Sequence, residues 1–270
     1  MLCSTIIAES GAPASPFMLS GGNLSDHLDT AASFGYHGVE LQIADAERFN
    51  KEPFLLKCSR LGLVVTSIGT GLAAKEGLSL SAADDAVRAA SVSRMMSQID
   101  LAAKIGAGTI VQLGLLKGLM RNCPDEKTYF NNLGRSVTAL ARYAEKKEVV
   151  IAFEPINHYE SDAFNTWDDA AAFIRAVGCG SLRLSLDLYH MRFEEKDILA
   201  SIRRHGALIG SVQLMDDNRM YPGGGCFRFE PIISAILETG YDGAVIMECL
   251  PLPTPETALK KAIEFYHNHF

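Results

Sequence analysis

The feature that most constrains this fold is an alternation. Short runs rich in β-branched and aliphatic residues take turns with longer amphipathic runs, and the pair occurs eight times. This order is typical of parallel strands joined by helical crossovers. Eight repeats predict an α/β fold that closes as a (β/α)8 TIM barrel. The predicted strands cover residues 2–8, 38–43, 63–68, 108–113, 149–154, 182–187, 208–215 and 244–248.

The chain is expected to form one domain over residues 1–270, a length that such barrels commonly reach. No Pro/Gly/Ser-rich linker or low-complexity tract divides it. The alternative architecture is an open doubly wound sheet, but no G-x-G-x-x-G follows the first strand. We therefore expect no nucleotide cofactor.

Local signals place several helix ends. Ser81 and Thr166 each precede an acid by three residues, the spacing of a capping box, and Gly106 and Gly178 stand where helices should end. One helix is expected to bury a stripe with steps of three and four, formed by Phe130, Leu133, Val137, Leu140 and Ala144.

Charge and cysteine usage exclude several classes of protein. The formal net charge is −7 and no basic stripe is present, which argues against nucleic-acid binding. Six scattered cysteines contain no C-x-x-C pair, a pattern that fits a reducing cytoplasm. No apolar stretch approaches the 18 residues of a membrane span, so we expect no membrane association.

Polar side chains stand at the ends of four predicted strands, where barrel enzymes place their chemistry. They are Glu154, Asp187, Gln213 and Glu248, and Glu40 near the end of the second strand is a further candidate for the pocket. Each acid alone could be a solvated strand end or a salt-bridge partner. Buried carboxylates are costly without a cation, so three around one barrel mouth predict a divalent metal.

Six ordered blocks of sequence add a family resemblance. They read SIGTG at 67–71, EGLSL at 76–80, EPINHYESDAFNT at 154–166, LDLYHMRFEE at 186–195, DDNRMYPGGG at 216–225 and ECLPLP at 248–253. The chain resembles the xylose-isomerase-like sugar isomerase and epimerase superfamily, particularly its ketose 3-epimerases and 5-keto-L-gluconate epimerases. The resemblance extends from residue 35 onward.

The resemblance implies roles for particular residues. Metal ligands fall on Glu154, Asp187, Gln213 and Glu248, and the catalytic pair on Glu154 and Glu248. Substrate-binding positions fall on Glu160, His190 and Arg219. The alternatives are purely structural roles: a loop salt bridge from Arg219 to Asp216 or Asp217, and a hydrogen-bonded histidine without a function at His190.

Position 213 departs from the family pattern, because relatives usually have His where Gln213 stands. An amide oxygen ligates hard cations but is a poorer partner than imidazole for zinc. The expected cofactor is therefore one Mn²⁺ or Mg²⁺ ion.

The predicted activity is epimerisation or isomerisation of a keto sugar or keto-sugar acid. A proton is removed and returned beside the carbonyl, through an enediolate. The alternatives are a hydroxypyruvate-type aldose–ketose isomerase, a sugar-binding protein with a weakened metal site, and a DNA-repair endonuclease, against which the acidic charge and the few histidines argue. Relatives also suggest a homo-oligomer.

Overall fold

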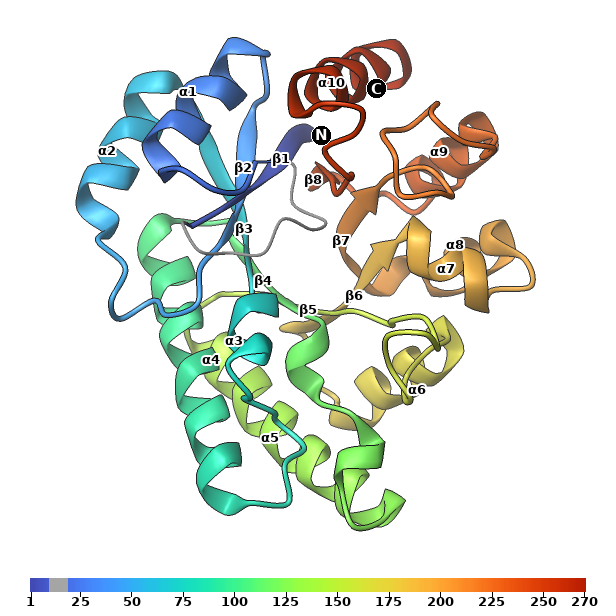
Figure 1. Ribbon diagram of the computed structural model, residues 1–270. Coiled ribbons are helices and arrows are strands. Elements are labelled where there is room, and N and C mark those ends of the chain that lie inside the picture. The colour runs from blue at the N-terminus through green and yellow to red at the C-terminus, as the bar shows by residue number, and fades with distance from the viewer. Residues whose placement is uncertain (10–18) are drawn as a thin grey trace.

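The structure is a computed structural model that describes residues 1–9 and 19–270. Eight parallel strands pair in chain order, β1 to β8, and β8 closes the barrel against β1. In Figure 1 the strands stand in the middle and the helices surround them. The predicted TIM barrel is confirmed. The strands are β1 Leu2–Ala8, β2 Gly38–Gln42, β3 Val64–Gly69, β4 Ile110–Leu113, β5 Ile151–Phe153, β6 Leu182–Asp187, β7 Ile209–Leu214 and β8 Ala244–Met247.

Helices connect the strands on the outside of the barrel. None within the described ranges is both long and apolar enough to cross a membrane. The α-helices are α1 Leu24–Ser33, α2 Lys51–Leu61, α3 Gly71–Lys75, α4 Asp85–Ile105, α5 Glu126–Lys146, α6 Trp167–Val177, α7 Leu188–Glu194, α8 Ile198–His205, α9 Phe229–Glu238 and α10 Pro255–His269. Short 3₁₀ turns are η1 Leu115–Lys117, η2 Met120–Asn122 and η3 Gly206–Leu208.

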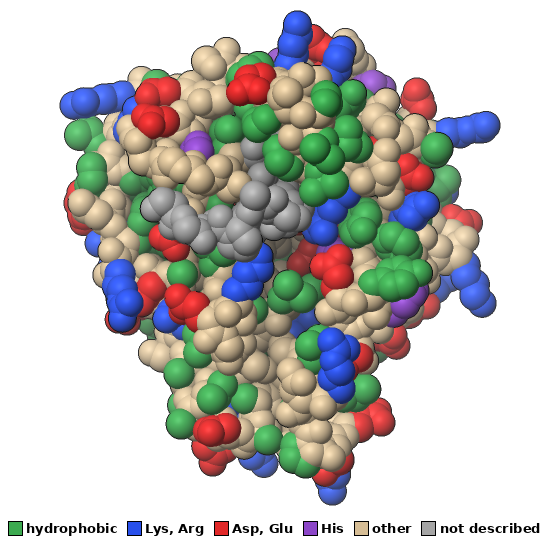
Figure 2. Space-filling view, in the orientation of Figure 1, with side chains coloured by type: hydrophobic (Ala, Val, Ile, Leu, Met, Phe, Trp, Pro, Cys, Tyr) green, Lys and Arg blue, Asp and Glu red, His purple; other side chains and the backbone are tan. Residues whose placement is uncertain are grey.

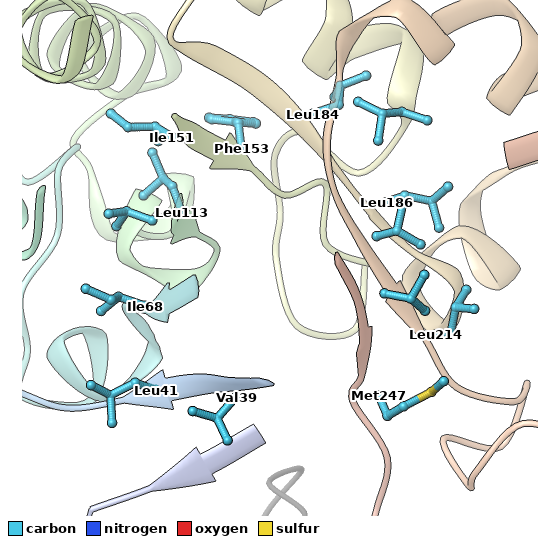
Figure 3. Packing of buried hydrophobic residues seen from close by; sticks show 14 of the residues in the cluster. Val39, Leu41, Ile68, Leu113, Ile151, Phe153, Leu184, Leu186, Leu214 and Met247 are labelled. Carbon is cyan, nitrogen blue, oxygen red and sulfur yellow. The ribbon is translucent and has the colours of Figure 1, made fainter. Parts of the chain in front are cut away.

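The strands alternate in character because successive side chains point to opposite faces. In β2, Val39 and Leu41 belong to the apolar core around the barrel, which Figure 3 shows together with buried side chains of the other strands. Glu40 lies between these two residues and Gln42 follows them, and both line a cavity inside the mouth of the barrel. The outward-facing residues thus pack against the helices, while the inward-facing residues place polar groups in the cavity.

Most of the predicted helix ends are confirmed. The Thr166 side chain caps α6 by accepting from the backbone N–H of Asp169, and Gly106 and Gly178 end α4 and α6. The cap at Ser81 is wrong. Asp84 caps α4 instead, because its carboxylate accepts from the N–H groups of two residues in the first turn.

The buried stripe of α5 is also corrected at one position. Phe130 is 38% exposed, and Tyr129 occupies the buried position beside it. The other four predicted residues of the stripe are buried. Tyr129 and Phe130 are in edge-to-face contact, so one aromatic residue covers the other at the end of the stripe.

Candidate active site

A cavity of about 220 Å³ opens at the carboxyl ends of the strands. We call it the mouth cavity. Near the middle of this face, Figure 2 shows acidic and basic side chains gathered at the opening. Asp187 is the last residue of β6, is 1% exposed and does not line the cavity. The other predicted site residues all line it: Glu154, Glu160, His190, Gln213, Arg219 and Glu248.

Three of these residues form one tight cluster. Ligand atoms of Glu154, Asp187 and His190 lie within 4.8 Å of one another. Asp187 ends β6 and caps α7 directly, since its Oδ1 accepts from the backbone N–H of His190 at 3.0 Å. The other oxygen, Oδ2, is buried and has no hydrogen-bond partner among the described residues. A buried carboxylate oxygen left unpaired is what an incoming cation would satisfy.

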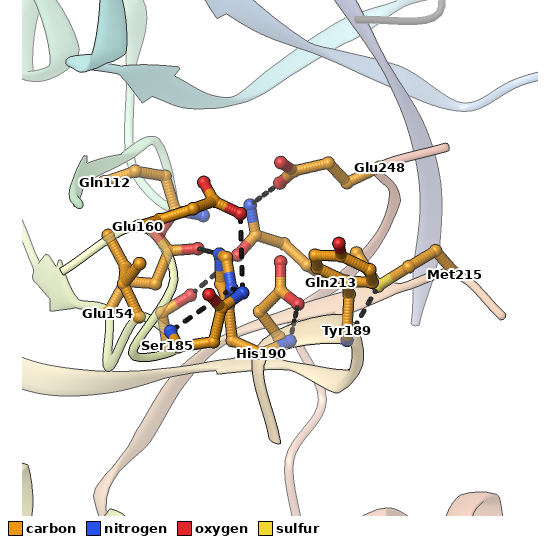
Figure 4. Close-up of polar contacts among 12 residues, drawn as sticks. Gln112, Glu154, Glu160, Ser185, Tyr189, His190, Gln213, Met215 and Glu248 are labelled. Atoms are coloured by element: carbon orange, nitrogen blue, oxygen red, sulfur yellow. Dashed lines mark hydrogen bonds and ion pairs between the residues drawn. The ribbon is translucent and has the colours of Figure 1, made fainter. Parts of the chain in front are cut away.

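The ring of His190 has a defined orientation. Its Nδ1 lies 2.7 Å from Nδ2 of Asn157, an amide group that can only donate, so Nδ1 is the acceptor. Nε2 therefore bears the hydrogen, and it lies 3.7 Å from Oε1 of Glu154. Burial lowers the pKa of His190. The ring is thus neutral near pH 7, and it lies beside Glu154 (Figure 4).

Glu248 belongs to a different set of contacts. Its Oε2 accepts from Nε2 of Gln213, and its Oε1 lies 3.0 Å from Nη2 of Arg219. Gln213 in turn accepts from Ser185 Oγ through Oε1 at 3.0 Å. The structure therefore brings Glu154 and Asp187 together with His190, and it holds the other two predicted ligands, Gln213 and Glu248, as a neighbouring pair.

Arg219 points into the site and does not bind the acids of its own loop. Its Nη1 lies 3.6 Å from Oε1 of Glu160, and its guanidinium lies over the Tyr189 ring at 4.6 Å. Asp217 pairs with Arg192 instead, at 3.5 Å. The backbone of Arg219 is left-handed, with φ of 63°, and this turn directs the side chain toward Glu248.

Crowding of the acids shifts their protonation. Burial, and then the negative charge of Asp187, raise the pKa of Glu154 to about 8 and raise that of Glu248 well above its usual range. Burial also raises the pKa of Glu40, which accepts from Ser67 and Gln42 at the bottom of the cavity. Without a cation, the mouth therefore retains protons that carboxyl groups normally release.

Lys117 lies next to the site and was not predicted from the sequence. It is 1% exposed, it donates to the backbone carbonyl of Glu154, and its ammonium lies 4.7 Å from the centre of the Phe153 ring. Burial lowers its pKa to about 8. It follows a leucine pair in a 3₁₀ turn, and nothing in that pattern distinguishes an inward lysine from a solvated one.

Gly114 leaves room for the Glu154 carboxylate. A Cβ at this position would come within 2.3 Å of Oε2 of Glu154, whereas a Cβ on Gly134 in α5 would meet no atom within 4 Å. We expect Gly114→Ala to displace the Glu154 carboxylate and to lower any activity that depends on this carboxylate roughly a hundredfold, the scale of loss when a group is misplaced by about 1 Å. Kinetics and circular dichroism of both variants would check this. Equal activity of Gly114→Ala and Gly134→Ala would contradict it.

Comparison with known proteins gives relatives that include sugar 3-epimerases. The chain is 33% identical over 114 residues to the D-psicose 3-epimerase of Enterocloster bolteae, but the match covers 42% of this chain and only 38% of that protein. It is 29% identical over 214 residues to the L-ribulose 3-epimerase of Mesorhizobium japonicum, covering 76% of this chain and 70% of that one.

A solved structure matches the whole fold. The D-psicose 3-epimerase of Clostridium cellulolyticum H10, determined with D-tagatose, superimposes with a TM-score of 0.84 at 19% identity, over 100% of this chain and 99% of that one. At this identity the likeness concerns the fold. The family model described as xylose isomerase-like TIM barrel matches residues 28–269. The chain therefore belongs to the xylose isomerase-like TIM barrel family.

Proposed function

We propose that this protein is a divalent-metal-dependent epimerase or isomerase of a keto sugar or keto-sugar acid. One observation carries the proposal: Glu154, Asp187 and His190 converge within 4.8 Å at the mouth of the barrel, and one Asp187 oxygen has no hydrogen-bond partner within residues 1–9 and 19–270. The relatives named as epimerases of D-psicose and L-ribulose support the reaction class.

The donor set fits a hard cation. Glu154, Asp187 and Glu248 supply carboxylate oxygens, which hard cations prefer. Burial and the neighbouring charge of Asp187 raise the pKa values of Glu154 and Glu248. Gln213 would join them through its amide oxygen. That requires the side-chain amide of Gln213 to rotate so that its oxygen and nitrogen exchange places. Ser185, which now donates to the amide oxygen, tolerates this because its hydroxyl can also accept. We propose Mn²⁺ or Mg²⁺ for this shell.

Bound there, the ion would polarise the substrate carbonyl and make the neighbouring hydrogen acidic. The protein's part is to move the proton: one of Glu154 and Glu248 removes it from one face of the carbon, and the other returns a proton to the opposite face of the enediolate. The Nε2–H of His190 donates to a substrate oxygen. Arg219 and Glu160 bind hydroxyl groups of the substrate that are further from its carbonyl. If the substrate is a sugar acid, Arg219 binds its carboxylate.

The test is NMR in D2O with added Mn²⁺ or Mg²⁺. It would use a panel of ketohexoses, keto-sugar acids and hydroxypyruvate, and compare the wild type with Glu154→Gln. We expect metal-dependent deuterium uptake beside the carbonyl, with product formation lost in the variant. The product separates epimerisation from hydroxypyruvate-type isomerisation. No uptake from any compound, with no metal bound, would overturn the proposal in favour of a binding protein.

Gln213→His tests the ligand set. Imidazole prefers zinc, so we expect the affinity for Zn²⁺ relative to Mg²⁺ to rise at least about tenfold. Gln213→Ala, which removes the oxygen without adding a nitrogen, should weaken binding of both ions. Competition calorimetry measures both effects. If both variants keep the wild-type affinities, residue 213 is no ligand.

We propose that residues 1–270 act as one domain, in a cytoplasmic protein that forms homo-oligomers and binds neither nucleic acid nor membranes. Free cysteines throughout the chain support a reducing compartment. Light scattering coupled to gel filtration would give the oligomeric state.

A further inference from the structure

A second cavity adjoins the mouth cavity. Its volume is about 260 Å³, and Lys75, Leu115 and Glu160 line both spaces. Its walls come from the end of α3 and the segment that follows, from η1 and η2, and from the loop after β5. In Figure 1 these segments lie together on one side of the barrel mouth. We call this space the side cavity, and a ligand held at the acids can extend into it past Glu160.

The walls of the side cavity combine apolar surface with hydroxyl groups. Leu115, which is 37% exposed, stands between the two cavities. Such surfaces suit a ring that has an apolar face and a hydroxylated edge. A carboxylate cluster like that of the mouth is absent among its lining residues. The other apolar residues are Ala74, Leu78 and Leu119, and the hydroxyls belong to Ser79 and Ser161.

The charged groups of these walls already have partners in the protein. Lys117 lines the side cavity and donates to the backbone carbonyl of Glu154. Glu160 lies 3.6 Å from Arg219 and 3.4 Å from the amide of Asn157. Lys75 also has an interaction within the chain. Since a charged ligand would have to compete with these contacts, a neutral one is favoured.

We propose that the side cavity binds a neutral glycosyl group carried on the distal end of the keto sugar. The preferred substrate is then a glycosylated ketose and not a free or phosphorylated monosaccharide. This inference rests on the proposed function, because the reacting end of the substrate is placed at Glu154 and Glu248.

The experiment compares three substrates in the same deuterium assay: D-fructose, D-fructose 6-phosphate and isomaltulose, which is fructose with a glucosyl group on its terminal oxygen. We expect kcat/KM to be at least about tenfold higher for isomaltulose than for the other two, the scale of a well-filled subsite. Ala74 lines only the side cavity, and Ala74→Leu should lower kcat/KM for isomaltulose about tenfold and leave fructose nearly unchanged.

Two further variants keep the test sharp. Asn122→Trp narrows the side cavity from an exposed position, so it should have the same selective effect without disturbing the core. Ala90→Leu, on the exposed surface of α4, is the matched control and should change nothing. Turnover of fructose without any preference for isomaltulose, or a preference for the phosphate, would overturn the subsite alone. No exchange from any of the three substrates would overturn the subsite, and the wider panel of ketohexoses, keto-sugar acids and hydroxypyruvate then decides the proposed function separately.

Discussion

Glu248→Gln and Glu154→Gln should each reduce interconversion of the two epimers by about 10³-fold, the middle of the range for a lost acid–base group. They should differ in which hydrogen they still exchange. Each variant retains the acid on one face of the substrate, so each should exchange the hydrogen of one epimer with D2O and convert neither. The two variants should act on opposite epimers.

The measurement is NMR of each purified epimer in D2O, with metal content determined for every variant. Gln keeps the size of Glu, and a surface substitution, Glu238→Gln on α9, is the matched control because its partner Arg203 is exposed. If both site variants exchange the same epimer, one acid performs both transfers. If metal content falls in parallel with the rate, the loss belongs to the metal site and not to proton transfer.

The metal-free protein should become less stable as pH rises from about 4.5 to 8. Glu154 has a folded-state pKa of about 8 against an ordinary 4.5, so over this window the folded protein holds a proton that the unfolded chain has released. The free energy of unfolding then falls with rising pH, by on the order of 4 kcal/mol for this group over the window. Glu248 shifts in the same direction and adds to the loss.

Urea unfolding with EDTA at several pH values would measure this. Other acids titrate too, so the informative quantity is the difference between the wild type and Glu154→Gln, which should lose the steepest part of the slope. Saturating Mn²⁺ should reverse the trend, since metal competes with protons for the same oxygens. A wild-type slope identical to that of the variant would mean that Glu154 is already ionised in the metal-free protein.

Much of the fold follows from sequence periodicity. All eight predicted strands are present, with ends within two residues of those observed, because each buried strand is an apolar run bounded by turn residues. The start of α4 was misplaced at Ser81. Asp84, which is followed by a second acidic residue, Asp85, is the better cap. Local spacing alone does not distinguish Asp84 from Ser81.

The site was predictable where it depends on strand ends. A barrel brings the ends of β5, β6, β7 and β8 to one mouth, so Glu154, Asp187 and Glu248 could be placed there before their contacts were known. Side-chain pairing was not predictable. The contacts of Arg219 with Glu248 and Glu160 depend on a left-handed turn, and the inward course of Lys117 depends on how a 3₁₀ turn lies over β5.

Asp187 combines two duties in one carboxyl group: one oxygen starts α7, and the other is turned to the site. Truncating this side chain would therefore loosen the helix that carries His190 at the same time as it removes charge. Under the proposed function, selection for folding and selection for metal binding act on the same side chain. Attempts to redirect the substrate preference of this barrel are better made in the walls of the side cavity, where shape can change without weakening the start of a helix.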